Sequence, residues 1–498
     1  MPSTTPSAMC GLIDWSASPP TPAEWINSSS ICARLVTVNK QGRREVLELS
    51  IDRPLTIGRH PSWYVPSPAF VSLPFGRIQS RCNRSSYVVP DIVASGIHCK
   101  LYAVRPSNGG VLVSCSDLST NGLLLNGHKI RKTSILLMDG DTIQIPHSQK
   151  FECIHTQKSP QKANIFDPTP PRNPSLKTKR IGRYLVTSHC LGSGSFATVH
   201  LAMDTSASRQ AACKTIKRKS KDKVDKVMKE VDILLSLDHP NINRVWAARH
   251  DNNFVHIFLE LCTGGDLFSY IVGHEDSRLC ESEAKYIMFQ LVKGLKYLHD
   301  RLISHRGMFR PRPENILLYT PGPYPRIQIA DFGLARPKAY QETFNVCGTV
   351  SYLPPEGILA LDHKHLGYVG MPADCWSAGV IMYIMLAGGH PFDYDKQDGE
   401  STWYSYRPSE DFDHSQLGDL SQTSVQSDRM VKKRIVHGEV EFPSYIWSSI
   451  PDARMLCGNL LVYDPLDRAT VHSALRSDWF SRELPELEAA YRERIGSS

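Results

Sequence analysis

Two glycines, a lysine and a glutamate in the C-terminal half are spaced as they would be to hold a phosphate group. Gly192 and Gly194 lie in the segment LGSGSFATVH, and glycine amides can approach an anion closely because no side chain covers them. Lys214 ends the segment AACK on the next predicted strand, where its ammonium group can meet phosphate oxygens. Glu230 falls in the helix expected beyond it and can hold that lysine by an ion pair. The third position of the glycine pattern is Ala197, so the turn alone does not separate a phosphate loop from an ordinary hairpin.

Two further residues carry the oxygen atoms that Mg²⁺ prefers. Asp331 in the segment DFG offers a carboxylate, and Asn315 in PENILL offers an amide oxygen. In this order, the glycine turn, the lysine, the glutamate and the two oxygen ligands resemble the eukaryotic protein kinases, over residues 184–480. The resemblance implies ATP and Mg²⁺ as cofactors, with Asn315 and Asp331 as the metal ligands.

The kinase resemblance assigns roles to further positions. Glu260 and Cys262 match the hinge that binds adenine through backbone groups, and Asp374 matches the helix aspartate that braces the catalytic loop. Glu356 is expected to pair with Arg468. The implied nucleotide-binding residues are Leu191, Gly192, Gly194, Val199, Lys214, Glu260 and Cys262. The implied catalytic residues are Lys214, Glu230, His305, Arg306, Asn315 and Asp331.

The catalytic loop departs from the family pattern. The family has His-Arg-Asp, in which the Asp accepts the proton of the substrate hydroxyl, and an Asn follows five residues after the Asp. This chain reads His305-Arg306-Gly307, and Asn315 follows Gly307 by eight residues. One explanation is a catalytically impaired pseudokinase that acts as a phosphothreonine-binding scaffold. The other is an error in the gene model at residues 307–311, because codons for Gly-Met-Phe can contain GTATGTT, which resembles a fungal intron donor site. The intact Mg²⁺ and phosphate residues favour the second explanation.

A second set of residues, in the N-terminal part, suits a phosphorylated peptide. Arg59 in LTIGRHPS offers a guanidinium group, Ser95 in SGIHCKLY a hydroxyl, and Asn121 in DLSTNG an amide that can hold a peptide backbone. This ordered set resembles the forkhead-associated (FHA) domain, which reads phosphothreonine with loops at one end of a β-sandwich. The resemblance implies phosphothreonine binding by Arg59, Ser95, Thr120 and Asn121, with His98 bracing the loops from within.

One FHA domain followed by a kinase domain resembles the DNA-damage and meiotic checkpoint effector kinases of the calcium/calmodulin-dependent group, and most of all their fungal meiosis-specific branch. The resemblance implies a nuclear serine/threonine protein kinase that docks on a phosphothreonine-containing adaptor protein, and it leaves the cytoplasm open as a second location. An FHA-mediated dimer would let neighbouring kinase domains phosphorylate each other's activation loops. Arg306 would then clamp the phosphorylated loop threonine, for which Thr343 in QETFNVCGT is the predicted site.

Two acidic positions bear on the protein substrates. Asp266 in CTGGDLF lies just past the hinge, and Glu314 in RPENILL lies on the catalytic loop. In basophilic kinases that the chain resembles, carboxylates at these positions receive an arginine that precedes the phosphorylated Ser or Thr, through a two-pronged hydrogen bond. A plainer interpretation gives Asp266 only a ribose hydroxyl and Glu314 only a role in loop structure. We expect substrates with Arg before the target residue.

Changes in composition along the chain predict its domains and fold class. We expect an all-β FHA sandwich of short β-branched strands at 31–155 and a two-lobed α+β kinase domain at 184–480. Apolar residues at helical spacing in 281–300 predict a helix of the second lobe. The remaining stretches are predicted as a disordered tail at 1–30, a linker at 156–183, a polar insertion at 394–428 and a C-terminal tail at 481–498.

Composition narrows the protein class further. The 498 residues are too many for one ordinary core, and thirteen cysteines without a CxxC pair argue against a zinc module and for reduced thiols. No apolar run approaches the length of a membrane span, and the N-terminus lacks the pattern of a secretory signal. The net charge of +7 is mild for this length. We therefore expect an intracellular protein without a membrane anchor and without direct nucleic-acid binding.

Overall fold

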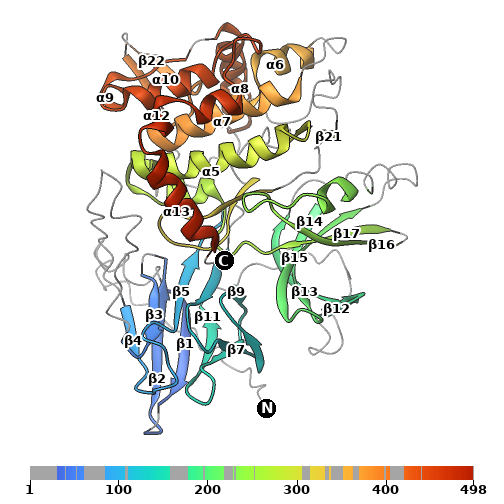
Figure 1. Ribbon diagram of the computed structural model, residues 1–498, viewed down its shortest axis with the longest axis vertical. Coiled ribbons are helices and arrows are strands. Elements are labelled where there is room, and N and C mark those ends of the chain that lie inside the picture. Colours follow the sequence, from blue (N-terminus) through green and yellow to red (C-terminus); the bar gives the residue numbers. More distant parts are fainter. Residues whose placement is uncertain are drawn as a thin grey trace, which may run out of the picture.

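The computed structural model shows an N-terminal β-sandwich beside a two-lobed α+β domain (Figure 1), as the sequence predicts. The fold class is therefore confirmed. The structure describes residues 31–39, 41–51, 53–60, 85–106, 110–156, 178–193, 197–217, 228, 231–251, 253–305, 315–330, 336–337, 352–362, 369–397, 400–403, 420–438 and 440–496. The predicted tail 1–30 and most of the predicted linker lie outside these residues.

The sandwich consists of two sheets. The first has the strand order β2-β1-β11-β10-β7-β8 and the second has the order β4-β3-β5-β6-β9. Their bounds are β1 Ile31–Val38, β2 Arg44–Ser50, β3 Leu55–Gly58, β4 Ser85–Val88, β5 Cys99–Val104, β6 Leu112–Asp117, β7 Leu123–Leu125, β8 His128–Ile130, β9 Ser134–Leu137, β10 Thr142–Gln144 and β11 Lys150–His155.

Alternating side chains explain how the two sheets pack. In β5 the residues Cys99, Leu101 and Ala103 point into the core, and the intervening residues are only partly buried. Such period-two burial is what a half-buried antiparallel strand requires. The loops that carry the predicted peptide-binding residues connect these strands at one end of the sandwich.

The small lobe of the second domain is an antiparallel sheet of the order β12-β13-β14-β15-β17-β16. Its strands are β12 Thr178–Ile181, β13 Tyr184–Ser193, β14 Ala197–Asp204, β15 Arg209–Lys217, β16 Val245–His250 and β17 Phe254–Glu260. Residues 178–181 fall within the predicted linker 156–183 but adopt regular structure. They form β12, an edge strand paired with β13, and its exposed polar side chains gave no alternating signal.

The large lobe is built around two long helices, α5 Glu281–His299 and α7 Gly370–Ala387, which pack against each other. The expected apolar positions of α5 are all buried, namely Ala284, Ile287, Met288, Leu291, Leu295 and Leu298. Within the described residues, α7 alone is long and apolar enough to cross a membrane by length and composition, and 83% of that window is buried inside the protein. This degree of burial is typical of a core helix.

Shorter elements complete the large lobe. The other helices are α4 Leu267–Val272, α6 Pro355–Asp362, α8 Leu420–His437, α9 Ser444–Trp447, α10 Pro451–Leu460, α11 Val471–Leu475, α12 Asp478–Ser481 and α13 Leu484–Gly496, with the 3-10 turn η2 Glu275–Ser277. The two-stranded sheets pair β18 Ile303–Ser304 with β21 Arg336–Pro337, β19 Ile316–Leu318 with β20 Ile327–Ile329, and β22 Tyr394–Gln397 with β23 Glu400–Trp403.

The segments predicted as a C-terminal tail and a polar insertion both contain regular secondary structure. The predicted C-terminal tail contains α13, which packs on α5 through the buried residues Leu487, Ala490 and Tyr491. The predicted polar insertion begins with the hairpin β22–β23, and its last described residues already belong to α8. Tyr394 at its start is fully buried. Both segments therefore contribute buried side chains to the large lobe.

Candidate functional site

The predicted phosphothreonine-binding residues come together at one end of the sandwich. The backbone amide of Arg59 donates to the carbonyl of Ser95 at 2.9 Å. The Ser95 hydroxyl accepts from the amide of Thr120 at 3.1 Å, and Nδ2 of Asn121 donates to the carbonyl of Val93 at 3.0 Å. Arg59, Thr120 and Asn121 are exposed. Their grouping gives one exposed edge with a guanidinium group, a hydroxyl and an amide, which suits a phosphorylated peptide.

A glycine and a buried histidine hold these loops together. A Cβ atom at Gly58 would lie 2.2 Å from the carbonyl oxygen of Gly96, so a side chain here would force β3 and the Ser95 loop apart. Nδ1 of His98 accepts from the amide of Ser95 at 3.1 Å, and Nε2 lies 3.2 Å from the carbonyl of Gly122. Burial lowers the pKa of His98, which favours the neutral ring that these two contacts require. His98 thus has the bracing position that the resemblance implied.

The predicted nucleotide residues of the small lobe share one face of its sheet. Gly192 lies opposite Val199 at the ends of β13 and β14, and Val199 in turn lies opposite Lys214 of β15. Because side chains alternate along a strand, Gln210, Ala212 and Lys214 of β15 point to the same side. Leu191 packs into an apolar cluster that contains Ala212. Gly194 and Glu230 lie outside the described residues.

The hinge after β17 is held by a buried amide network that sequence reasoning missed. Nδ2 of Asn243 donates to the carbonyl of Glu260 at 3.0 Å and to Oε1 of Gln328 at 2.7 Å. Nε2 of Gln328 donates to the carboxylate of Glu260 at 2.6 Å, and the Cys262 thiol donates to Gln328 at 3.2 Å. Burial raises the pKa of the Cys262 thiol. The polar residues Asn243 and Gln328 within apolar segments were the available signal, because buried amides need partners.

The structure describes the first and last residues of the catalytic loop, His305 and Asn315. His305 is buried, and its Nε2 lies 2.9 Å from the carbonyl of Ala330. The carbonyl of Asn315 accepts from the amide of Ala330 at 2.7 Å, so Asn315 lies beside the residue that directly precedes Asp331 in the chain. Arg306, Gly307, Glu314, Asp331 and Thr343 lie outside the described residues, and their predicted roles remain predictions.

A buried carboxylate fixes the start of this loop. Oδ2 of Asp374, on α7, accepts from the backbone amide of His305 at 2.8 Å and lies 3.1 Å from Nε2 of His299 on α5. Asp374 is fully buried. The contact with the His305 amide is the bracing contact that the sequence predicts for this aspartate.

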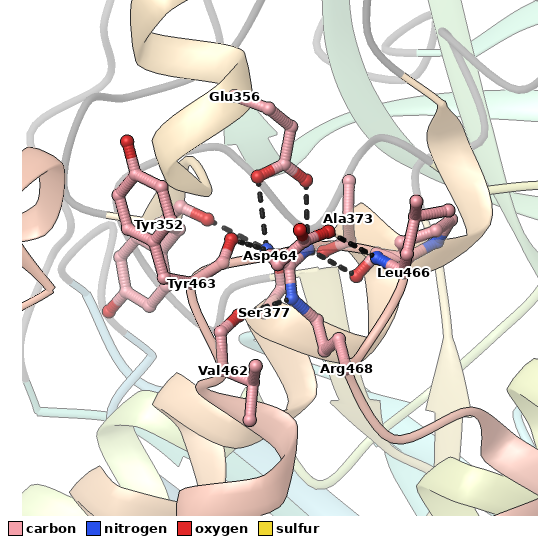
Figure 2. A network of polar contacts seen from close by, with 10 residues as sticks. Tyr352, Glu356, Ala373, Ser377, Val462, Tyr463, Asp464, Leu466 and Arg468 are labelled. Atoms are coloured by element: carbon pink, nitrogen blue, oxygen red, sulfur yellow. Dashed lines mark hydrogen bonds and ion pairs between the residues drawn. The ribbon is translucent and has the colours of Figure 1, made fainter.

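An ion pair links the first turn of α6 to the segment between α10 and α11 (Figure 2). Nη1 and Nη2 of Arg468 donate to the two carboxylate oxygens of Glu356 at 2.8 and 3.0 Å. The same guanidinium group donates to the carbonyls of Val462, Pro372 and Tyr463. The Arg468 side chain is 0% exposed. Such fork-to-fork geometry fixes orientation as well as adding binding energy.

Asp266 lies where the hinge passes into α4. Its carboxylate accepts from the amide of Ser269 at 2.8 Å and from the hydroxyl of Ser269 at 3.0 Å, which makes it the N-cap of the helix. The residue is 5% exposed. In this arrangement two hydrogen bonds hold the carboxylate in a fixed orientation.

Comparisons with known proteins identify the two domains. The family model for the protein kinase domain matches residues 185–480, and that for the FHA domain matches residues 55–146. The chain is 32% identical over 427 residues to the meiosis-specific serine/threonine-protein kinase mek1 of Schizosaccharomyces pombe, and the match covers 83% of each protein. It is 28% identical over 452 residues to the meiosis-specific serine/threonine-protein kinase MEK1 of Saccharomyces cerevisiae, covering 84% of this chain and 82% of that protein. The crystal structure of Rad53 1-466 in complex with AMP-PNP matches with a TM-score of 0.45 and 24% identity, over 90% of this chain and 100% of that one.

We expect Arg468→Met to destabilise the large lobe strongly, since it leaves the Glu356 carboxylate without its partner. Breaking a buried ion pair on one side typically costs about 3–5 kcal/mol. Urea-induced unfolding, followed by tryptophan fluorescence, measures this loss. The matched control is Arg482→Met, which breaks the pair with Asp452 where the arginine side chain is 67% exposed. That change should cost less than about 1 kcal/mol, and equal losses in the two variants would contradict the anchoring role.

Proposed function

The chain belongs to the protein kinase family and carries an FHA domain, and from this premise we propose that it is a nuclear checkpoint kinase that is recruited by phosphothreonine. It is a serine/threonine protein kinase that transfers the γ-phosphoryl group of ATP to proteins. Its FHA domain docks on a phosphothreonine-containing adaptor protein in DNA-damage or meiotic recombination signalling. The observation that carries the proposal is the presence, in one chain, of the Arg59–Ser95–Asn121 edge and the Lys214 cleft. The similarity to two fungal meiosis-specific kinases supports the meiotic setting.

Docking would act through local concentration. When two copies bind neighbouring phosphothreonines on an adaptor, one activation loop meets the other kinase domain at an effective concentration set by the tether. Phosphorylation of Thr343 would add a charge that Arg306 can bind, which orders the loop. This route needs an FHA domain whose peptide-binding edge is open, and Arg59, Thr120 and Asn121 are exposed.

The cleft residues fit ATP with Mg²⁺. Lys214 lies on the same sheet face as Val199, beside the Gly192 turn, and Asn315 is hydrogen-bonded to the residue before Asp331. An ammonium group, a glycine turn and two oxygen donors are the chemistry that a metal-bound triphosphate needs. Bound Mg²⁺ would neutralise charge on the phosphate oxygens. Lys214 would orient the phosphates, and the backbone groups of Glu260 and Cys262 would bind adenine.

An active kinase and a pseudokinase scaffold differ in whether the catalytic loop contains a general base. Gly307 has no carboxylate, so this position cannot accept the proton of the substrate hydroxyl as the family's aspartate does. The intact positions Lys214, Asn315 and Asp331 support the active enzyme, with the error in the gene model at 307–311. The scaffold would bind nucleotide and phosphothreonine and transfer phosphate slowly.

Sequencing the spliced transcript across the codons for 306–312 tests the proposal first. We expect His-Arg-Asp, with the Asn five residues after the Asp. Protein from that transcript should phosphorylate a basic peptide about 10²–10⁴-fold faster than the printed chain, because a general base contributes that factor. Both proteins should bind Mg-ATP alike. A transcript that encodes Gly307-Met308-Phe309 would favour the scaffold.

Docking is tested with Arg59→Ala in the full chain. Hydrogen bonds to charged groups contribute about 1.5–3 kcal/mol, so affinity for a phosphothreonine peptide should fall about tenfold or more. Fluorescence polarisation measures the affinity, with the phosphoserine and unmodified peptides as ligand controls. Arg53→Ala, at another exposed arginine near β3, is the matched control and should bind normally. Unchanged affinity in a folded Arg59→Ala chain would show that the phosphate binds elsewhere.

Substrate preference is tested at Asp266. We propose that Asp266, together with Glu314, receives an arginine three residues before the target Ser or Thr. Asp266→Asn keeps an oxygen to accept from Ser269 and removes the charge, whereas Asp266→Ala also removes the helix cap. With the enzyme from the corrected transcript on a peptide array, both variants should lose preference for Arg at that position. Equal rates with Arg, Ala or Glu in the unmodified enzyme would refute the assignment.

A further inference from the structure

One face of the FHA sandwich lies against the kinase domain instead of facing solvent (Figure 1). The contact centres on Leu136 of the edge strand β9. Its neighbours Ile135 and Leu137 point into the sandwich core, so Leu136 points outward. An outward residue of an edge strand is normally polar, yet Leu136 is only 1% exposed and does not belong to the FHA core. The kinase domain is what buries it.

The backbone of Leu136 is bound by a side chain of the small lobe. Oε1 of Gln210 accepts from the Leu136 amide at 2.7 Å, and Nε2 of Gln210 donates to the Leu136 carbonyl at 2.8 Å. The amide group of Gln210 therefore pairs with β9 as a neighbouring strand would. Gln210 lies two positions from Ala212 and four from Lys214 on the same face of β15.

The Leu136 side chain enters the apolar cluster of the nucleotide cleft. This cluster joins Leu136 with Leu201, Ala212 and Leu261, and Leu112 and Met138 of the sandwich pack against it. Leu191, Val199 and Leu259 complete it from the kinase side. Leu191 and Val199 are predicted nucleotide-binding residues, and Leu261 lies between the hinge residues Glu260 and Cys262. The FHA domain thus contributes side chains to the surface that a bound nucleotide would use.

The sandwich also reaches the far side of the cleft. A Cβ atom at Gly265 would lie 2.9 Å from Cγ1 of Val104, so the β5 strand of the sandwich lies against the backbone beside Asp266. A Cβ atom at Gly322, in the large lobe, would lie 3.3 Å from the hydroxyl of Tyr102. The FHA domain therefore contacts the small lobe, the hinge and the large lobe together.

The phosphothreonine edge is at the opposite end of the same strands. The pairing of β5 with β6 runs from Cys99 opposite Asp117, next to the peptide-binding loops, to Val104 opposite Leu112, next to the kinase domain. The cover on the cleft leaves the Arg59 edge accessible. The domain can read phosphothreonine while it covers the cleft.

We propose that the FHA domain is a built-in cover of the nucleotide cleft, and that nucleotide competes with Leu136 for the apolar cluster of Ala212 and Leu261. This inference rests on the proposed kinase function, because it concerns the same cleft. The covered chain is a resting state with reduced nucleotide affinity. The apparent affinity for nucleotide is proportional to the fraction of uncovered molecules. Any change that weakens the cover therefore raises that affinity.

Binding of a fluorescent ATP analogue with Mg²⁺ to the full chain tests the cover from both sides. Gln210→Ala removes two hydrogen bonds from the kinase side and should tighten binding about fivefold or more. Leu136→Glu places a charge in the cluster from the FHA side and should tighten binding about tenfold or more. The matched control is Val46→Glu, at a valine of β2 that is 50% exposed, and it should bind as the unmodified chain does.

The affinity for a phosphothreonine peptide shows whether the FHA domain of the Leu136→Glu variant is folded. If that domain is unfolded, the Gln210→Ala variant alone tests the cover. The double variant should bind no more tightly than the stronger single variant, because both changes release one contact. If the unmodified chain binds the analogue and neither variant binds it more tightly, the cover is refuted while the kinase function stands. If neither the unmodified chain nor any variant binds the analogue, the proposed nucleotide site is refuted, and so is the cover.

Discussion

A buried carboxylate, that of Asp374, is the constraint on which the kinase domain depends. It lies on the core helix α7, and one of its oxygens accepts from the backbone of His305 while facing the ring of His299 on α5. A buried charge without donors would cost several kcal/mol, so these partners cannot separate cheaply. The contact therefore joins the two long helices to the start of the catalytic loop. The carbonyl of Asn315, at the other end of that loop, accepts from the Ala330 amide, so hydrogen bonds hold both described ends of the loop.

The ordered motifs could be predicted from the sequence because each consists of a few residues with a fixed local role. The apolar spacing of α5 predicted its buried face, and the Glu356–Arg468 pair was predicted from the positions of both residues and is present. Local patterns failed where the signal was weak or distant. The strand β12 carries exposed polar residues on both faces, and the buried residues of α13 lie beyond the last kinase motif. The contact of Leu136 with Gln210 joins residues 74 positions apart, which no local pattern encodes.

The same sandwich has two ends with different chemistry. At one end Ser95, Thr120 and Asn121 present hydroxyl and amide groups, and the backbone of the exposed residue Arg59 is hydrogen-bonded to Ser95. At the other end Leu112, Leu136 and Met138 present apolar surface to the kinase cleft. A phosphorylated peptide would thus bind at one end of the sandwich, whereas a nucleotide would compete with the other end for the kinase domain. In this arrangement the binding of a phosphothreonine peptide does not require the FHA domain to leave the kinase domain. Peptide binding can therefore come before nucleotide binding.

The amide of Leu136 offers the most direct measurement of this arrangement, since its hydrogen bond is made to Gln210 of the kinase domain. Hydrogen–deuterium exchange of the full chain, resolved to this amide by mass spectrometry with fragmentation, reports whether the two domains are in contact. The account predicts slow exchange in the free chain, no acceleration by a phosphothreonine peptide, and clear acceleration by AMP-PNP with Mg²⁺. Fast exchange in the free chain, or slow exchange that the nucleotide leaves unchanged, would contradict it.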